Sequence, residues 1–200
     1  MRNSSRRALI VVDVQNDFCE GGSLGVAGGS EVAREIARHV TERRGDYDHV
    51  VATADWHLDP GDHFAPSPDY VSTWPAHCLA GSDGADFHPH LAPGLYHVDA
   101  TFRKGRYAAA YSGFEGRSDD AGQVLLALWL AERGVGQVDV VGIATDHCVR
   151  ATALDAVREG FEATVLLDLT AGVARATTEA ALLELRTSGV RLEGAPVLNV

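Results

Sequence analysis

The sequence is short of positive charge. Its 200 residues include 17 lysines and arginines against 28 aspartates and glutamates, which gives a net charge of −11. Arg2, Arg6 and Arg7 cluster near the start, but no basic helix or stripe follows them. Because phosphate binding needs a concentrated basic face, this balance excludes nucleic acid as the main partner.

Long apolar runs and cysteines are also scarce. The longest apolar run, 124–131, is far shorter than the roughly 20 residues that span a bilayer. The stretch 8–12 leads straight into Asp13 without a small-residue cleavage site, so no secretory signal peptide is expected. The three cysteines lack disulfide spacing, which indicates a reducing compartment. We therefore expect an acidic cytoplasmic protein with one domain over residues 1–200, a monomer or small homo-oligomer without membrane partners.

Apolar, β-branched segments alternate with helical patterns through most of the chain. The predicted strands are 8–13, 49–54, 96–102, 138–144, 163–169 and a short strand after Gly189; the predicted helices are 30–44 with Ser30 as its cap, 120–133, 146–159 and 177–187. Strands separated by helices imply right-handed crossovers and a parallel sheet covered on both faces. Ligands bind beyond the carboxyl ends of such strands, so a site is expected just after Asp13, Ala54, Phe102 and Ala144.

One carboxylate and three histidines follow the predicted strand 49–54. Asp55, His57, His63 and His77 lie in the stretch 55–95, which lacks periodicity and holds five of the nine histidines. Asp55 and His57 project to the same side of extended backbone and can converge on one ion. A solvated, histidine-rich loop is the alternative for any single histidine. Together the four residues favour one divalent metal ion of the zinc, iron or manganese type.

Cys148 lies in a segment typical of a nucleophile. The segment 142–148 reads as a strand end, a tight turn and the first turn of the next helix. A thiol there faces free backbone N–H groups and the positive end of the helix dipole, so we expect a lowered pKa. The same N–H groups can stabilise an oxyanion. A buried structural cysteine is the alternative, and it is the one we expect for Cys19 and Cys78.

Asp13 ends the first predicted strand, and Lys104 follows the third. A carboxylate after five apolar residues is costly unless it is paired or functional. Asp13 could take the proton of a thiol nucleophile, and Lys104 could hold that carboxylate and stabilise negative charge on the sulfur. A buried structural ion pair between them is the alternative. Function is favoured because three independent groups map to the same edge of one sheet.

Taken together, these motifs resemble those of the nicotinamidase/pyrazinamidase branch of the isochorismatase-like cysteine hydrolases. The matching segments are 13–18 (DVQNDF), 21–24 (GGSL), 55–57 (DWH), 74–78 (WPAHC), 104–105 (KG) and 142–149 (GIATDHCV). The resemblance covers nearly the whole chain, and the order and combination of the motifs are highly specific. Two features depart from many members: five residues separate His57 from His63 instead of three, and Ala109-Ala110 replaces Asp-Ser before Tyr111.

The resemblance implies a fold, a site and an activity. The fold would be a three-layer α/β/α architecture with a six-stranded, mainly parallel sheet. Asp13, Lys104 and Cys148 would form the catalytic triad, and Asp55, His57, His63 and His77 would hold the metal. The N–H groups of Ala144 and Cys148 would form the oxyanion hole, with a cis peptide bond before Ala144. The pocket would be lined by Phe18, Leu24, Trp74, Tyr111, Ile143 and His147.

The implied activity is hydrolysis of nicotinamide to nicotinate and ammonia through a cysteine thioester, a step of NAD salvage. Pyrazinamide, which has a nitrogen at the same ring position, would also be accepted. Three alternatives stay open: a related hydrolase acting on another small amide, a purely metal-dependent hydrolase, and a non-catalytic metal-binding protein on the same scaffold.

Overall fold

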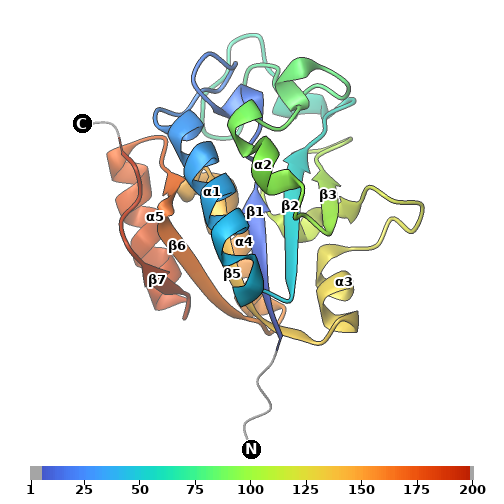
Figure 1. Ribbon diagram of the computed structural model, residues 1–200. Helices are drawn as coiled ribbons and strands as arrows, with labels where there is room; N and C mark the ends of the chain where they lie inside the picture. Colours follow the sequence, from blue (N-terminus) through green and yellow to red (C-terminus); the bar gives the residue numbers. More distant parts are fainter. Residues whose placement is uncertain (1–5, 199–200) are drawn as a thin grey trace, which may run out of the picture.

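The computed structural model describes residues 6–198, which form a seven-stranded sheet with helices on both faces (Figure 1). The strands are β1 (Arg6–Val12), β2 (His49–Asp55), β3 (Ala100–Lys104), β4 (Arg117–Ser118), β5 (Val135–Ile143), β6 (Glu162–Ala171) and β7 (Arg191–Glu193). Their order across the sheet is β4-β3-β2-β1-β5-β6-β7. All neighbours are parallel except β3 and β4, which are antiparallel.

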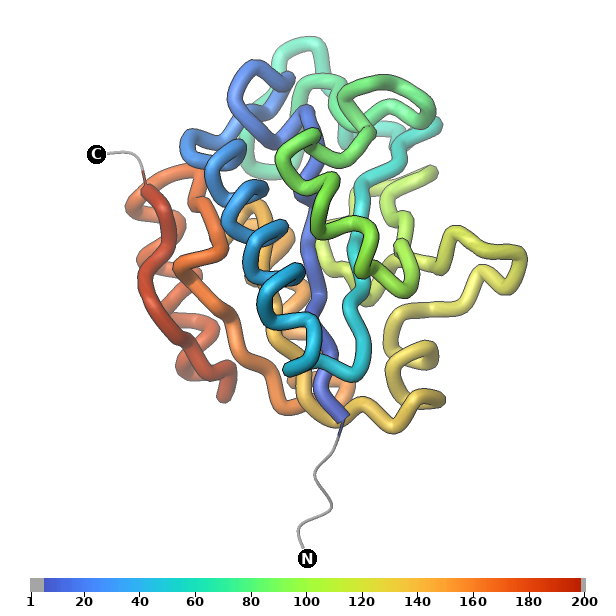
Figure 2. The backbone as a smooth tube through the Cα atoms, viewed as in Figure 1, coloured from blue at the N-terminus to red at the C-terminus, as the bar shows by residue number. Residues whose placement is uncertain are grey.

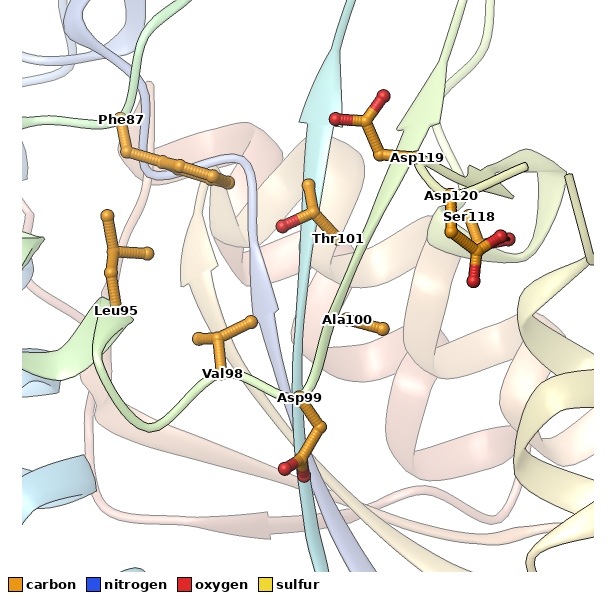
Figure 3. Close-up of a pocket in the computed structure, with 9 residues that line it drawn as sticks. All are labelled: Phe87, Leu95, Val98, Asp99, Ala100, Thr101, Ser118, Asp119 and Asp120. Carbon is orange, nitrogen blue, oxygen red and sulfur yellow. Dashed lines mark hydrogen bonds between the residues drawn. The ribbon is translucent and has the colours of Figure 1, made fainter. Parts of the chain in front are cut away.

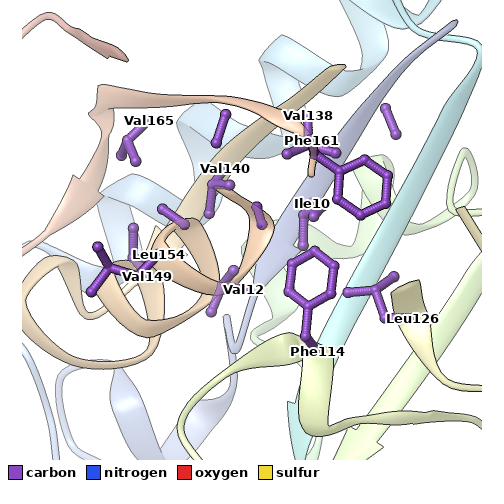
Figure 4. Packing of buried hydrophobic residues seen from close by; sticks show 14 of the residues in the cluster. Ile10, Val12, Phe114, Leu126, Val138, Val140, Val149, Leu154, Phe161 and Val165 are labelled. Atoms are coloured by element: carbon purple, nitrogen blue, oxygen red, sulfur yellow. The ribbon is translucent and has the colours of Figure 1, made fainter. Parts of the chain in front are cut away.

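Side chains of β1 alternate between the two faces of the sheet and so belong to two cores. Ala8, Ile10 and Val12 pack in one apolar cluster, and Leu9 and Val11 in the other. All five are at most 1% exposed. Figure 4 shows part of the first cluster, where side chains from β1, β5 and β6 meet those of the helices on that face of the sheet. A central strand buried on both faces explains why its sequence is continuously apolar.

Within residues 6–198, five α-helices cover the sheet. They are α1 (Gly29–Arg43), α2 (Ala92–Leu95), α3 (Leu126–Glu132), α4 (Arg150–Arg158) and α5 (Arg175–Thr187). Residues of α1 and α2 pack in the second cluster, and residues of α3, α4 and α5 pack in the first. The backbone trace in Figure 2 shows α1 and α2 running over one face, with the long loops gathered above the carboxyl ends of the central strands. The expected layered α/β architecture is confirmed.

The sheet has seven strands where the resemblance implied six. The additional strand, β4, has two residues, and it pairs with β3 at Phe102 and Arg103. Such a short antiparallel strand has no period long enough to be found in the sequence. The strand predicted at 96–102 begins instead at Ala100, because Gly94 to Val98 close a helical turn whose Tyr96 is 89% exposed.

Helix starts also differ from the predictions, and the last helix begins at Arg175 instead of Thr177. Gly28, rather than Ser30, is the N-cap of α1, and the Glu20 carboxylate accepts hydrogen bonds from the N–H groups of both residues. The helix predicted at 120–133 begins only at Leu126, because Gln123 has a positive φ of 48° and closes a turn. The helix predicted at 146–159 begins as a π-helical turn, Thr145–Val149, before α4.

The strand order places the predicted site. β3, β2, β1 and β5 are adjacent, so the segments that follow them meet at one edge of the sheet. Within residues 6–198 no helix combines the length and hydrophobicity needed to cross a membrane.

Candidate active site and metal centre

Lys104 lies between two buried carboxylates. Its Nζ is 2.9 Å from Asp13 Oδ2 and 2.5 Å from Asp55 Oδ1, and it donates a third contact of 3.1 Å to the Ala110 carbonyl oxygen. The side chains of Lys104 and Asp13 are completely enclosed, and that of Asp55 is 4% exposed. Burying three charges is tolerated because each has an opposite charge in contact.

The Cys148 thiol faces this ion-pair cluster. Its Sγ is 3.7 Å from Lys104 Nζ, and it lies within 4.8 Å of a carboxylate oxygen of Asp13 and of one of Asp55. Cys148 is in the π-helical turn after β5. The buried Asp146 anchors this turn, because its carboxylate accepts hydrogen bonds from Val173 N–H and the Thr177 hydroxyl just before and within α5.

Burial shapes the proton affinities of this cluster. It raises the pKa of the Cys148 thiol well above its usual value, outweighing the nearby Lys104 ammonium. Burial also raises the pKa of Asp13. For Lys104, burial works toward a lower pKa, but the carboxylates of Asp13 and Asp55 outweigh it and raise the pKa. The lowered thiol pKa expected from the helix start is therefore wrong, because burial acts on the sulfur more strongly than the neighbouring cation does.

The three predicted histidines surround one point beside Asp55. Ligand atoms of His57, His63 and His77 all lie within 4.8 Å of one another, and each ring is buried. Nε2 of His57 and of His77 lie 3.6 and 3.9 Å from Asp55 Oδ2. Asp55 therefore contacts Lys104 through one oxygen and faces the histidines with the other.

The hydrogen bonds of these histidines fit a metal site. His57 Nδ1 contacts the Gly105 carbonyl oxygen at 2.5 Å, and His77 Nδ1 contacts that of Pro75 at 2.8 Å, which leaves both Nε2 atoms facing the centre. Within residues 6–198, His57 Nε2 and His63 Nδ1 are buried without a hydrogen-bond partner. Three imidazole nitrogens and one carboxylate oxygen form a donor set that suits zinc, iron or manganese.

The longer spacing before His63 is accommodated by a 3-10 turn, Gly61–His63. It returns the His63 ring to 5.2 Å from His57 and 5.4 Å from His77. Phe64, for which the sequence predicted no role, packs against the rings of all three histidines at centroid distances of 5.1 to 5.7 Å. An apolar ring at this position excludes water from the ligands.

Gln15 is a second residue for which the sequence predicted no role at the site. Its side-chain amide donates to the Asp55 carbonyl oxygen at 2.9 Å and to the Ala85 carbonyl oxygen at 2.8 Å, and it accepts from Asp55 N–H at 2.8 Å. Gln15 is completely buried. It therefore fixes the backbone of Asp55 at the point where β2 ends.

Aromatic side chains form one wall next to the thiol. Trp74 Nε1 donates to the Tyr111 hydroxyl at 2.9 Å. The His147 ring lies 5.4 Å from Trp74 and is stacked at 6.5 Å on Tyr111. Phe18 approaches from the loop after β1 and lies 5.6 Å from the His77 ring.

The remaining predicted residues complete the surroundings. Leu24 is half-buried in the loop after β1, and Ile143 is buried at the end of β5. The peptide bond between Ile143 and Ala144 is cis, as the resemblance implied. Ala144 is 7% exposed and begins the turn that carries Cys148.

A cavity of about 470 Å³ lies elsewhere, beside the pairing of β3 and β4 (Figure 3). None of the predicted site residues lines it. Its acidic side chains already have partners: Asp99 accepts from Val50 N–H, Asp119 pairs with Arg103, and Asp120 accepts from Ser118. The chemistry is therefore concentrated at the carboxyl ends of the central strands and not at this cavity.

Gly105 is the residue on which the orientation of His57 depends. Its φ is +76°, and an added Cβ would lie 2.5 Å from His57 Cε1. We expect Gly105→Ala to weaken zinc binding on the order of 10- to 100-fold, as loss of a residue that orients a metal ligand usually does. The measurement is a zinc titration of metal-free protein against a competing chelator.

Gly134→Ala is the matched control. Gly134 has a similar φ of +71°, but no atom lies within 4 Å of an added Cβ. Both variants should lose about 1 kcal/mol of stability from the strained backbone. Equal zinc affinities in the two variants would show that the contact with His57 is unimportant.

Comparisons with known proteins agree with this geometry. The model of the isochorismatase domain family matches residues 7–197. The chain is 61% identical to the nicotinamidase/pyrazinamidase of Mycobacterium tuberculosis over 186 residues, which cover 93% of this chain and 97% of that protein. The pyrazinamidase of Pyrococcus horikoshii in complex with zinc has a TM-score of 0.79 at 36% identity, covering 94% of this chain and 98% of that one.

A second solved structure, PnC1 from L. infantum in complex with nicotinate, has a TM-score of 0.80 at 35% identity and covers 98% of both chains. The resemblance seen in the motifs is thus confirmed along almost the whole length. The chain belongs to the isochorismatase family, in its nicotinamidase/pyrazinamidase branch.

Proposed function

We propose that this protein is a nicotinamidase that hydrolyses nicotinamide to nicotinate and ammonia, and that it also accepts pyrazinamide. The observation that carries the proposal is the contact of one buried lysine with Asp13, Asp55 and the Cys148 thiol, directly beside the three histidines. A thiol, a carboxylate base and a cation in one enclosed cluster supply what covalent amide hydrolysis requires. The relationship to the M. tuberculosis enzyme supports the same activity.

The first half of the reaction forms a thioester. Asp13 takes the Cys148 proton, and the thiolate attacks the carboxamide carbon, so that a C–S bond forms as the carbonyl π-bond opens. The N–H groups of Ala144 and Cys148 stabilise the resulting oxyanion. Asp13 then gives its proton to the leaving nitrogen, the C–N bond breaks and ammonia departs. Burial raises the pKa of Asp13, which suits a group that must both accept and return a proton.

The second half of the reaction hydrolyses the thioester. Asp13, again ionised, takes a proton from water, whose oxygen attacks the thioester carbon. The C–S bond breaks, the sulfur recovers the proton from Asp13, and the product leaves as nicotinic acid, which gives its remaining proton to solvent to become nicotinate. Lys104 keeps Asp13 oriented throughout, because its Nζ contacts Oδ2 at 2.9 Å and also lies beside the sulfur.

Asp55, His57, His63 and His77 would hold one divalent metal ion. When bound, that ion supplies a Lewis acid that can hold the ring nitrogen of the substrate and so orient the carboxamide. The zinc in the P. horikoshii relative supports zinc, while iron and manganese suit the same donors. Elemental analysis of protein purified without added metal identifies the ion.

The substrate pocket would be formed by the aromatic wall of Trp74, Tyr111 and His147 together with Phe18, Leu24 and Ile143. A small, neutral, aromatic ring suits such a wall. We infer that the protein works as one domain over residues 1–200, as a monomer or small homo-oligomer. We place it in the cytoplasm, because a free catalytic thiol needs a reducing compartment.

The test is a product assay with three amides. Nicotinamide should give ammonia and nicotinate in equal amounts, and pyrazinamide should also be hydrolysed. Benzamide, which has the same carboxamide without a ring nitrogen, is the matched control and should be a much poorer substrate. Hydrolysis of another amide alone would indicate a related amidase, and metal binding without any ammonia release would contradict the proposal.

A further inference from the structure

The hydroxyl of Thr53 contacts Asp13, the base of the proposed reaction. Thr53 lies in β2 and is completely buried. Its Oγ1 donates to Asp13 Oδ1 at 2.6 Å. Its carbonyl oxygen accepts from Asp13 N–H at 3.2 Å, so one threonine holds both the backbone and the side chain of Asp13.

Asp13 has an unusual backbone that makes this double contact informative. Its φ is +50°, a left-handed value that residues other than glycine rarely adopt. Such a conformation persists only where neighbouring groups fix it, and it is found most often at functional sites. β1 ends one residue earlier, at Val12, so the contacts from Thr53 on the adjacent strand β2 supply that constraint.

The hydrogen bond from Thr53 makes the two oxygens of Asp13 unequal. Oδ1 is occupied by the hydroxyl. Oδ2 is 2.9 Å from Lys104 Nζ, yet within residues 6–198 it is buried without a hydrogen bond of good geometry. A carboxylate rotates freely about its terminal bond unless a donor fixes it. With Oδ1 committed, Oδ2 is the oxygen left to exchange a proton with the sulfur.

We propose that Thr53 is a positioning residue for the catalytic base, its hydroxyl orienting Asp13 so that Oδ2 is the atom that accepts the Cys148 proton. This inference rests on the proposed function. Thr53 and Asp55 project to the same side of β2, because they are two residues apart. One strand face therefore orients both carboxylates that contact Lys104.

The hydroxyl and the methyl group of Thr53 can be tested separately. The methyl group packs tightly at Gly113, since a Cβ added to that glycine would lie 2.7 Å from Thr53 Cγ2. Thr53→Val keeps this volume and removes the donor. Thr53→Ser keeps the donor and removes the methyl group. A positioning role and a purely packing role therefore predict opposite orders of activity.

The experiment compares steady-state kinetics of both variants on nicotinamide. We expect Thr53→Val to lower kcat on the order of 10- to 100-fold, part of what an aligned base contributes. KM should change less than about twofold, because Thr53 is enclosed and does not reach the substrate. Thr53→Ser should retain kcat within about threefold. A larger loss for serine than for valine, or equal losses, would overturn the proposal.

A control variant in another strand and a measurement of thiol reactivity that needs no substrate complete the experiment. Thr164→Val makes the same change in β6, at the register of Asp139 and Leu9 toward the other end of the sheet, and should leave kcat unchanged. The alkylation rate of Cys148 by iodoacetamide, followed by mass spectrometry of its peptide, needs no substrate. The alkylation rate should fall in Thr53→Val and persist in Thr53→Ser even if nicotinamide is not the substrate. Equal rates in the parent, Thr53→Val and Thr53→Ser would refute the role of Thr53.

Discussion

Cys148→Ala should lower kcat for ammonia release from nicotinamide by at least about 10⁴-fold, the scale of losses seen when the nucleophile of a catalytic triad is removed. The physical reason is that alanine cannot form the thioester, and no other described side chain offers a nucleophile at that position. Asp13 and Lys104 lose their function together with the sulfur, because all three act on one proton. The folded structure and zinc binding should persist, because the sulfur of Cys148 groups with the carboxylates of Asp13 and Asp55 and not with the three histidines.

Cys19→Ala is the matched control for this variant. Cys19 is also buried and free, and burial raises the pKa of its thiol to about 12, but it is not part of the cluster that Cys148 forms with Asp13 and Asp55. This variant should keep full turnover at the cost of about 1 kcal/mol of stability for the lost atom. Normal turnover in Cys148→Ala, with activity lost only on chelation, would instead indicate a metal-dependent hydrolase. Zinc content measured in both proteins separates loss of the nucleophile from loss of the metal.

The positions of the main chemical groups were predictable because parallel strands align their carboxyl ends. Asp13, Asp55, Lys104 and the segment before Cys148 each lie at or just after the end of a strand, and β1, β2, β3 and β5 are neighbours in the sheet. Any such arrangement brings the following residues to one edge. A further sign in the sequence is that Lys104 is the sole lysine among 17 basic residues.

The residues that orient these groups were not predictable. Thr53 is a β-branched residue in a buried strand, where threonine needs no functional explanation. Gln15 and Phe64 gain their roles only when distant segments fold against them. The pKa of Cys148 depends on how deeply the π-helical turn is enclosed, so the helix start alone gave the wrong direction. Local pattern indicates which elements form, while tertiary contacts determine their electrostatics.

Lys104→Met should produce the second large effect, a loss of stability together with loss of activity. Methionine has similar volume but no charge, so Asp13 and Asp55 would face each other in an enclosed site without their shared cation. Removing one partner of a buried ion pair costs about 3–5 kcal/mol because the remaining charge is uncompensated. The measurement is urea unfolding of metal-free protein, with zinc affinity and turnover measured in parallel.

Arg7→Met is the control for losing a cation beside a buried carboxylate. Arg7 pairs with Asp139 at 2.6 Å, but its side chain is 40% exposed and Asp139 keeps a hydrogen bond from the Tyr47 hydroxyl. This variant should lose about 1 kcal/mol or less and retain activity, because the Arg7 end of the pair is solvated and Asp139 keeps its hydrogen bond from Tyr47. A similar loss in both variants would mean that the two carboxylates do not need Lys104.

The pH dependence of the stability lost in Lys104→Met distinguishes uncompensated charge from lost packing. In the parent protein Lys104 holds the pKa of Asp55 below its ordinary value of 3.8, so this pair stabilises the fold above that pH and is lost only in strong acid. The raised pKa of Lys104 means that its contribution persists up to at least its ordinary value of 10.5. Without the lysine, burial raises the carboxyl pKa values, and each unfavourable ionisation costs stability as pH rises. The free energy of unfolding that the variant loses relative to the parent should therefore be smaller near about pH 5 than near about pH 8. At the higher pH the unfolded chain ionises both carboxyl groups freely, whereas the folded variant does so only at a cost in free energy. A deficit independent of pH would show that lost packing, rather than uncompensated charge, causes the instability.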